Sequence, residues 1–376
     1  MTTRILHVVG RMDRGGVETW LMHVLRTIDR SRFQMDFLVH TEKPSAYDDE
    51  IRALGSRIIP CLHPSQPIQY AQNFRRIMRE YGAYDVVHSH VHHFSGYVLW
   101  LAHRAGVPVR IAHSHSNTSS LQAQASIPRR LYLKSMRWLI GRYATTGLGV
   151  SKGAGAALLG AAWETDARWR ILYYGIDLTP FETPIDRASV RGELGIPQDA
   201  FVVGHVGRFV DVKNHRFIIQ IAEELVRQKP EAYLLLVGDG PLRPAIEQQI
   251  HDVGLEGRVI LAGLRDDVPR LMMGGMDVFL MPSFYEGLPM VLIEAQAAGL
   301  PCIISDVITP EIQILESHIE YYSLSQSPEK WVNRILAMNQ KKGTVLNDQN
   351  LSLVANSPFN IRQSLSLLEK IYEPSR

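Results

Sequence analysis

The stretch that decides the fold is Ser283-Phe-Tyr-Glu-Gly-Leu-Pro-Met-Val-Leu-Ile-Glu-Ala-Gln296. It follows a short apolar run that predicts a buried strand, and Gly287 and Pro289 predict that a helix begins here. Glu286 then stands just before that helix and Glu294 about two turns inside it. The free amides at a helix N-terminus can bind an anion, and ribose hydroxyls are suitable donors to a carboxylate among apolar neighbours. From spacing alone, a surface glutamate is an equal alternative for Glu294.

Outward from this stretch, short β-branched or apolar runs alternate with longer segments of helical period. This alternation predicts an α/β fold of parallel sheets covered by helices. The runs expected as strands in the first half are Ile5–Val9, Phe33–Val39, Asp85–His88, Val109–His113 and Gly147–Val150. Those expected in the second half are Phe201–Val206, Tyr233–Val237, Val259–Ala262, Val278–Met281 and Cys302–Ile304.

The two series predict two doubly wound, Rossmann-like domains. Gly and two prolines in Gly175–Pro184 indicate a linker, so we expect domains at 1–178 and 179–360. The polar stretch Asn339–Asn360 interrupts the helical period, and Ile361–Tyr372 resumes it. We expect this last helix, within 361–376, to return to the first domain, and a cleft between the domains to be the binding site.

Composition excludes several classes of protein. A chain of 376 residues with 45% hydrophobic and 21% charged residues is globular rather than disordered or fibrous. Its two cysteines, Cys61 and Cys302, form neither a disulfide framework nor a CxxC metal motif. Without a recognisable signal peptide or an apolar run of about 18 residues, we expect a cytoplasmic protein.

The net charge of +2 conceals two unlike halves. Residues 1–178 carry 22 Lys+Arg against 13 Asp+Glu (+9), which leaves 18 against 25 (−7) for the rest. A helix predicted over Pro128–Arg142 lies in an acid-free stretch and carries a basic patch of Arg129, Arg130, Lys134 and Arg137. It is typical of a helix lying on an anionic membrane, with a core-facing helix as the equal alternative. No nucleic-acid-binding motif accompanies the charge.

Two glycine-containing loops follow predicted strands. Gly10-Arg-Met-Asp-Arg-Gly-Gly-Val-Glu18 opens a helix near Val17, where glycines let backbone amides approach an anion, although a plain turn explains it equally well. Val206-Gly-Arg-Phe-Val-Asp-Val-Lys-Asn-His215 holds Arg208 and Lys213, which could both reach a pyrophosphate. Solvated loop charges are the alternative.

Histidines gather at two predicted strand ends. His88, His90, His92 and His93 follow one strand, and His113 and His115 follow another. Alternate strand residues share a face, so a three-histidine metal site is conceivable. Because the acidic residues that often orient metal-bound histidines are missing nearby, we expect no metal and no other cofactor.

The order of these features resembles the retaining glycosyltransferases of family 4, whose GT-B fold consists of two facing Rossmann-like domains. Along nearly the whole chain, the matching elements are GGVE (Gly15–Glu18), IAHSHS (Ile111–Ser116), YGID (Tyr174–Asp177), VGRFVDVKN (Val206–Asn214), VGDGP (Val237–Pro241), AGLRDDV (Ala262–Val268) and PSFYEGLPMVLIEAQAAGLP (Pro282–Pro301). The chain looks most like enzymes that extend bacterial exopolysaccharide or capsule repeat units.

The resemblance implies a role for each matching residue. Arg208 and Lys213 would hold the nucleotide diphosphate, Glu286 the donor sugar and Glu294 the ribose. Further donor contacts would come from Gly16, Gly238, Leu264, Arg265, Val268, Gly287 and Leu288. His113 or His115 would lie at the reacting carbon, with His113 slightly preferred. Tyr174 stands where the family commonly has Asn, which puts any polar role of that Asn in doubt.

The resemblance therefore predicts a retaining, metal-independent transfer of a sugar from a nucleotide-diphospho-sugar, UDP-linked by expectation. The acceptor would be a lipid-linked glycan or an oligosaccharide at the inner face of the cell membrane. Charge on the leaving diphosphate would be stabilised by Arg, Lys and helix amides. The alternatives are a sugar-nucleotide epimerase of GT-B fold and a non-catalytic, glycosyltransferase-like subunit.

Overall fold

The computed structural model describes residues 2–119, 122, 124–339 and 347–373. The chain divides into two compact units, Met1–Gly175 with Ile361–Arg376 and Ile176–Asn360. The boundary lies three residues before the expected one at 178/179. We describe each unit by itself.

The first unit is built on a seven-stranded sheet in the order β3-β2-β1-β4-β5-β6-β7, and all of its strand pairs are parallel. Its strands are β1 (Thr3–Val9), β2 (Phe33–Val39), β3 (Ile58–Pro60), β4 (Val86–Ser89), β5 (Val109–Ser114), β6 (Thr146–Gly149) and β7 (Trp169–Ile171). Its helices are α1 (Gly16–Thr27), α2 (Asp48–Ala53), α3 (Pro67–Glu80), α4 (Ser95–Arg104), α6 (Ile127–Tyr143), α7 (Lys152–Leu159) and α16 (Ile361–Tyr372).

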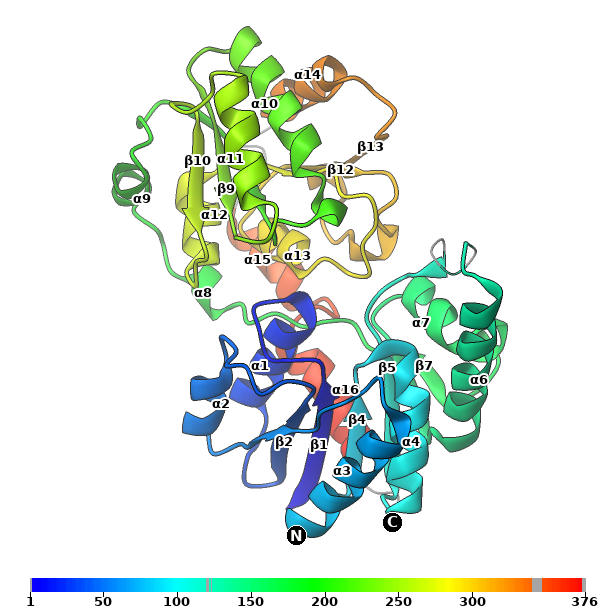
Figure 1. Cartoon of the computed structure of the whole chain (residues 1–376). Coiled ribbons are helices and arrows are strands. Elements are labelled where there is room, and N and C mark those ends of the chain that lie inside the picture. Colours follow the sequence, from blue (N-terminus) through cyan, green and yellow to red (C-terminus); the bar gives the residue numbers. More distant parts are fainter. Residues whose placement is uncertain (1, 120–121, 123, 340–346, 374–376) are drawn as a thin grey trace. The chain divides into compact units, whose positions relative to one another are not determined.

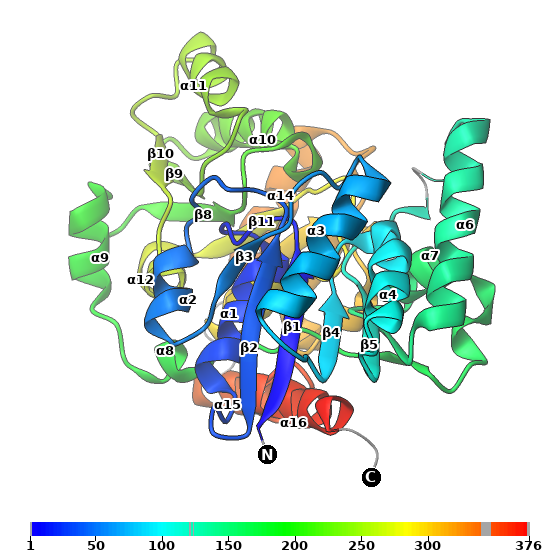
Figure 2. The same cartoon turned by 60° about the horizontal axis from the view of Figure 1, so that its bottom comes forward.

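The last helix, α16, returns to the first unit, as expected. It packs against α1 (Figures 1 and 2), and Arg32 forms ion pairs with Glu369 (3.3 Å) and Glu373 (2.5 Å) of the C-terminal segment. At Gly175 the backbone passes so close to Ile361 that a Cβ would lie 2.4 Å from its Cα. The glycine of the YGID motif therefore allows the returning helix to reach its place.

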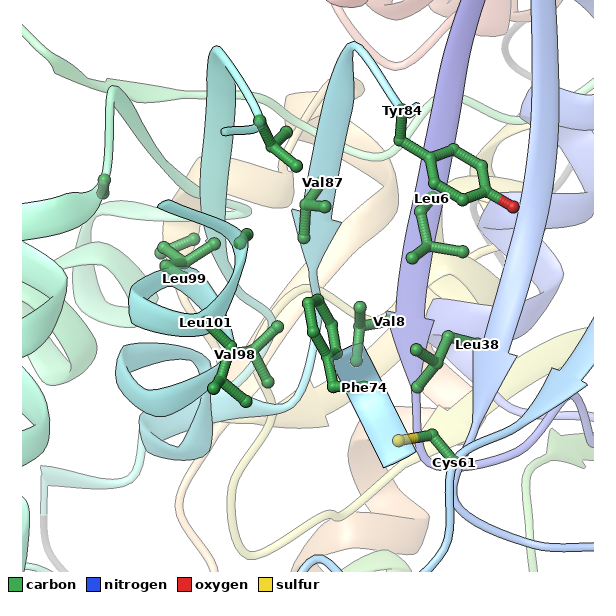
Figure 3. Packing of buried hydrophobic residues seen from close by; sticks show 14 of the residues in the cluster. Leu6, Val8, Leu38, Cys61, Phe74, Tyr84, Val87, Val98, Leu99 and Leu101 are labelled. Atoms are coloured by element: carbon green, nitrogen blue, oxygen red, sulfur yellow. The ribbon is translucent and has the colours of Figure 1, made fainter. Parts of the chain in front are cut away.

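The two faces of the first sheet carry different side chains, because successive side chains of a strand point to opposite faces. Leu6 and Val8 of β1 pack with Leu38 of β2 and with side chains of α3 and α4, among them Phe74 and Val98 (Figure 3). Complete burial of such side chains contributes roughly 1.5–3 kcal/mol each. His7 alternates with these residues and points to the opposite face, which α1 and α16 cover.

The second unit contains a six-stranded parallel sheet in the order β10-β9-β8-β11-β12-β13. Its strands are β8 (Phe201–Val206), β9 (Ala232–Val237), β10 (Val259–Gly263), β11 (Val278–Met281), β12 (Cys302–Ser305) and β13 (Ile319–Tyr322). Its helices are α8 (Thr179–Glu182), α9 (Arg187–Leu194), α10 (His215–Gln228), α11 (Arg243–Asp252), α12 (Val268–Gly275), α13 (Met290–Ala297), α14 (Pro328–Asn339) and α15 (Asn347–Ala355).

The structure corrects the sequence prediction in three places. The short outer strands β3, β7 and β13 were not expected. The polar stretch Asn339–Asn360 contains the helix α15, which packs against α13, although residues 340–346 lie outside the described part of the chain. The predicted linker Gly175–Pro184 includes the short helix α8.

In both sheets the order in which successive strands are added reverses at a switch point, which lies between β1 and β4 in the first unit and between β8 and β11 in the second. Open α/β sheets bind ligands beyond the carboxyl ends of the strands at such a point. The loops that follow these four strands are therefore the places to look for a site. No helix among the described residues is long and apolar enough to cross a membrane.

Candidate functional site

The loops that follow β8 and β11 bring Lys213 and Glu286 together at the switch point of the second unit. The Nζ atom of Lys213 lies 2.7 Å from Oε1 of Glu286, and the two side chains are only 15% and 13% exposed. Two hydrogen bonds join these loops: the backbone N–H of Phe284 donates to Val212 O at 2.9 Å, and the side-chain amide Nδ2 of Asn214 donates to Pro282 O at 3.1 Å. A partly desolvated cation and carboxylate thus stand where a ligand is expected.

Glycines shape the floor of this region. A Cβ at Gly238, where φ is +136°, would lie 2.1 Å from the carbonyl oxygen of Gly207. A Cβ at Gly207 would lie 3.3 Å from Cε of Lys213 and 3.0 Å from Nε2 of the buried His205. Close backbone approach therefore requires glycine at Gly238, and Gly207 leaves room for the lysine side chain. The exposed side chain of Arg208 follows directly.

Helix α13 places the second carboxylate of the motif. The helix begins at Met290, with Pro289 as its N-cap, so Glu294 is its fifth residue and lies just over one turn inside rather than two. The side chain is half-buried among apolar neighbours, and desolvation raises the pKa of its carboxyl to about 7. Gly287 is half-buried and Leu288 buried in the turn before the helix.

The loop after β10 contains the residues predicted at the base. Leu264 is an apolar side chain that is 60% exposed, and Val268 begins α12. The guanidinium of Arg265 forms ion pairs with Asp267 and Glu193, both at 2.7 Å. Arg265 is therefore held by carboxylates of its own unit, and Leu264 is the exposed apolar side chain of this loop.

In the first unit, the loop after β1 ends at the N-terminus of α1. Gly15 is the N-cap and Gly16 the first helical residue, and beyond its chain neighbours and its own helix no atom of the described residues lies within 4 Å of a Cβ built on Gly16. A Cβ on Gly15 would lie 2.4 Å from Oε2 of Glu18. The carboxylate of Glu18 thus folds back over the start of the helix.

The two histidines proposed for the reacting carbon differ in exposure. His113 is completely buried within β5, which corrects the preference for it as a substrate contact. His115 lies one residue beyond β5 and is partly exposed. Both its nitrogens have partners: Nδ1 lies 2.5 Å from the hydroxyl of Tyr174, and Nε2 lies 2.8 Å from Nδ1 of His90.

Sequence reasoning missed part of this histidine network. It noted His88 and His90 but not His7, and it treated Tyr174 only as a departure from the family motif. The signal in the sequence is histidine at alternate positions of neighbouring strands, whose partners are set by register. His7 stands directly opposite His88 in the β1–β4 pair.

Helix α6 carries the basic patch, with one correction. Arg129, Arg130 and Lys134 are exposed, whereas Arg137 turns inward and donates hydrogen bonds to Gln122 and, at 2.9 Å, to Ala157 O. The same helix exposes three large apolar side chains: Ile127 (74%), Leu131 (63%) and Trp138 (64%). Their spacing of four and seven places them on one face.

Two Rossmann-like units in one chain, the second with a cation and a carboxylate paired at its switch point, match the architecture of GT-B glycosyltransferases. Family models described as glycosyl transferases group 1 and glycosyltransferase family 4 match residues 200–340 and 14–179. EpsF of Bacillus subtilis, which is named a glycosyltransferase, is 37% identical over 99% of this chain and 97% of EpsF. The chain belongs to glycosyltransferase family 4.

A more distant relative and a solved structure are also similar to this chain over most of its length. The Escherichia coli UDP-Gal:alpha-D-GlcNAc-diphosphoundecaprenol alpha-1,3-galactosyltransferase is 22% identical over 98% of this chain and 96% of the enzyme. The crystal structure of HepE from Anabaena, in complex with UDP and glucose, superposes with a TM-score of 0.79 at 20% identity and covers 98% of both chains. These relatives give no support to the epimerase or to the non-catalytic subunit.

Proposed function

We propose that the enzyme moves a sugar from a UDP-sugar to a lipid-linked or oligosaccharide acceptor in exopolysaccharide or capsule synthesis, with retention of anomeric configuration and without a metal. The observation that carries this proposal is the Lys213–Glu286 pair at the β8–β11 switch point, with Glu294 eight residues further on. UDP is bound by HepE and named in the donor of the Escherichia coli relative.

Each group at this site has chemistry that suits one part of such a donor. Lys213 and Arg208 would neutralise the diphosphate that leaves when the anomeric C–O bond breaks. Glu286 would accept hydrogen bonds from the donor sugar, Glu294 would accept them from the ribose, and the exposed Leu264 would contact the base. Amides at Gly287, Leu288 and Gly238 would add to the diphosphate contacts.

His115 replaces His113 as the histidine that we propose near the reacting carbon. Its partial exposure at the carboxyl end of β5 lets a substrate approach it, whereas His113 is covered on all sides. Its nitrogens are held by Tyr174 and His90, so its proton arrangement depends on its neighbours.

Calorimetric titration with UDP, with ADP as the control nucleotide, tests the donor half of the proposal. We expect heat with UDP and much less with ADP. A screen of UDP-sugars with mass-spectrometric detection of donor hydrolysis, with and without EDTA, would then identify the sugar. Absence of heat with UDP at millimolar concentration would contradict the proposal, and loss of activity in EDTA would contradict its metal independence.

Binding of UDP should strengthen as the pH rises through 7. Hydrogen bonds from the ribose favour ionised Glu294, whose pKa in the free enzyme is about 7, so the affinity at pH 6 should be about tenfold below that at pH 8. Because phosphate also titrates near pH 6, Glu294→Gln is the control: it should lose the part of the pH dependence due to the carboxyl. The same pH profile in both proteins would exclude Glu294 from the site.

We further propose that α6 docks on anionic membrane, which would bring the enzyme to a lipid-linked acceptor. The apolar face of Ile127, Leu131 and Trp138 can enter the interface while Arg129, Arg130 and Lys134 pair with lipid headgroups.

Neutralising Arg129, Arg130 and Lys134 should weaken binding to phosphatidylglycerol-containing vesicles by roughly 10²-fold, at about 1 kcal/mol per basic residue. Replacing Leu131 and Trp138 by serine should weaken it even at low salt. A vesicle sedimentation assay measures both effects. The charge-matched control is neutralisation of Arg75, Arg76 and Arg79 on α3. Equal losses in that control would mean that net charge, and not α6, determines binding.

A further inference from the structure

Five histidines, four of them buried and His115 partly exposed, share one face of the first sheet. Register places His7 opposite His88, and His88 opposite Ile111, so that alternate residues of β4 and β5 point to the same side. This brings His90, His113 and His115 beside them. The covering helices add Trp20 from α1 and Tyr372 from the last turn of α16.

The first half of the network runs from Tyr174 to His7. The hydroxyl of Tyr174 lies 2.5 Å from Nδ1 of His115, and Nε2 of His115 lies 2.8 Å from Nδ1 of His90. Nε2 of His90 lies 2.9 Å from Nδ1 of His7. Along this series, each imidazole contacts the preceding group through Nδ1 and the following group through Nε2.

The second half continues through Tyr372 with the same pattern. Nε2 of His7 lies 3.5 Å from the Tyr372 hydroxyl, which lies 2.8 Å from Nδ1 of His88. Nε2 of His88 lies 3.1 Å from Nδ1 of His113. The series of hydrogen bonds ends at Nε2 of His113, a buried atom with no hydrogen-bond partner among the described residues.

A count of protons restricts how this chain can be arranged. Burial lowers the pKa of all five imidazoles, to about 3 for His7 and His115, so each carries one ring proton at neutral pH. With one proton on each phenol, seven protons serve six hydrogen bonds. The seventh proton must therefore lie outside the six hydrogen bonds, on Nε2 of His113 or on the hydroxyl of Tyr372 or Tyr174. At any other position it would make two N–H groups, or an N–H and an O–H group, point at each other.

Only one of these arrangements leaves a single atom unpaired. If Tyr174 or Tyr372 keeps the spare proton, its buried hydroxyl donates to none of the hydrogen-bond partners that the described residues offer it, and Nε2 of His113 again has no donor. If Tyr174 donates to His115, each following group donates to the next, and only the Nε2–H of His113 lacks a partner. Since every unpaired buried polar group is costly, the arrangement in which Tyr174 is the first donor is favoured.

We propose that these side chains form one proton-ordered chain in which all five imidazoles are neutral Nε2–H tautomers, and that Tyr174 is the positioning residue that holds His115 in this state. The placement of His115 at the reacting carbon rests on the proposed function, but the proton order does not. Tyr174 thus acquires a polar role at the position where the family commonly has Asn.

The distances between the imidazole nitrogens favour this series of hydrogen bonds over a metal site, although His90, His113 and His115 could each offer a nitrogen within 4.8 Å of the others. The linked nitrogens are 2.8–3.1 Å apart, the length of a hydrogen bond. Nitrogens bound to a tetrahedral zinc at about 2.0–2.1 Å would be roughly 3.3–3.4 Å apart.

Two-bond 1H–15N correlation spectra of the full chain labelled with 15N-histidine distinguish both neutral tautomers and the imidazolium. We expect Nε2–H signals from all five imidazoles between pH 6 and 8. An Nδ1–H or charged imidazole at His115, or a stoichiometric bound metal in the purified protein, would overturn the proposal. This measurement on the unaltered protein requires no variant to fold.

Two matched variants, each lacking one buried hydroxyl, test the role of Tyr174. In Tyr174→Phe the hydrogen bonds can run from His115 toward His113 or in the reverse direction, and the two arrangements leave equal numbers of atoms unpaired. The tautomers of His115 and His90 should therefore become mixed. In Tyr372→Phe only His88 and His113 should become mixed, because Tyr174 still donates to His115. An unchanged His115 tautomer in Tyr174→Phe would overturn the assignment.

Activity separates the positioning role from the proposed function. Tyr174→Phe should lower kcat by about tenfold, the scale of one lost oriented hydrogen bond, with an unchanged Kd for UDP. A normal kcat with mixed tautomers would overturn the positioning role alone. Ordered tautomers in a wild-type protein that neither binds UDP nor transfers sugar would overturn the proposed function instead.

Discussion

Replacing Lys213 by alanine is expected to lower the turnover of sugar transfer by roughly 10²-fold or more, the scale of removing one preorganised charge from a site where negative charge develops. Lys213 is 15% exposed and has Glu286 2.7 Å away, so its ammonium is held in place before a donor binds. The variant should also lose most of the thermal stabilisation that UDP gives the wild type.

The second unit offers a matched control for this substitution. Lys229 also pairs with a glutamate, Glu231 at 2.5 Å, but at a more exposed position in the turn after α10. Lys229→Ala should leave turnover and the response to UDP unchanged. Near-normal turnover in both Lys213→Ala and Glu286→Ala would show that the active site lies elsewhere.

Acidification is expected to destabilise the first unit steeply below pH 6.5. The buried imidazoles titrate near 6.5 in the unfolded chain, whereas the pKa values of His7 and His115 are about 3 in the folded chain and those of His88, His90 and His113 are also well below 6.5. In this window the unfolded chain binds more protons, so the free energy of unfolding falls as the pH falls, by up to about 1.4 kcal/mol per histidine and pH unit.

Five such histidines would cost up to roughly 7 kcal/mol at pH 5.5, comparable with the whole stability of a domain. Hydrogen exchange of the full chain, followed by mass spectrometry at pH 7.5, 6.5 and 5.5, should show rising exposure of peptides from 1–175 after correction for the intrinsic rate. His90→Gln should reduce the slope, and His251→Gln, at an exposed side chain, should not. Equal protection at all three pH values would refute this prediction.

Much of the fold follows from local pattern. The ten predicted strands are present, and their bounds agree to within two residues because apolar runs between helical segments are a strong signal. The missed strands β3, β7 and β13 have only three or four residues at or near the sheet edges. Helix α15 was missed because its own sequence has little helical pattern and it is stabilised by packing against α13.

In the candidate site, too, some features follow from the sequence and others only from the tertiary structure. The spacing of Glu286 and Glu294, and the loop with Arg208 and Lys213, are legible in the sequence, and strand order brings their loops together. The sequence does not say which charges are already engaged. Arg137 and Arg265 are basic residues in predicted sites, yet each is held by neighbours of its own unit, and such partners are set by side-chain packing.

By itself, the sequence determined the family, the two α/β domains and the returning C-terminal helix, and it supplied the residues that we propose for the donor site, because these depend on periodicity and on motifs within short segments. Only the tertiary structure decided that His113 is covered, that Arg137 turns inward and that five histidines and two tyrosines form one chain. Hydrogen-bond partners depend on strand register and helix packing, which join residues as distant as His7 and Tyr372.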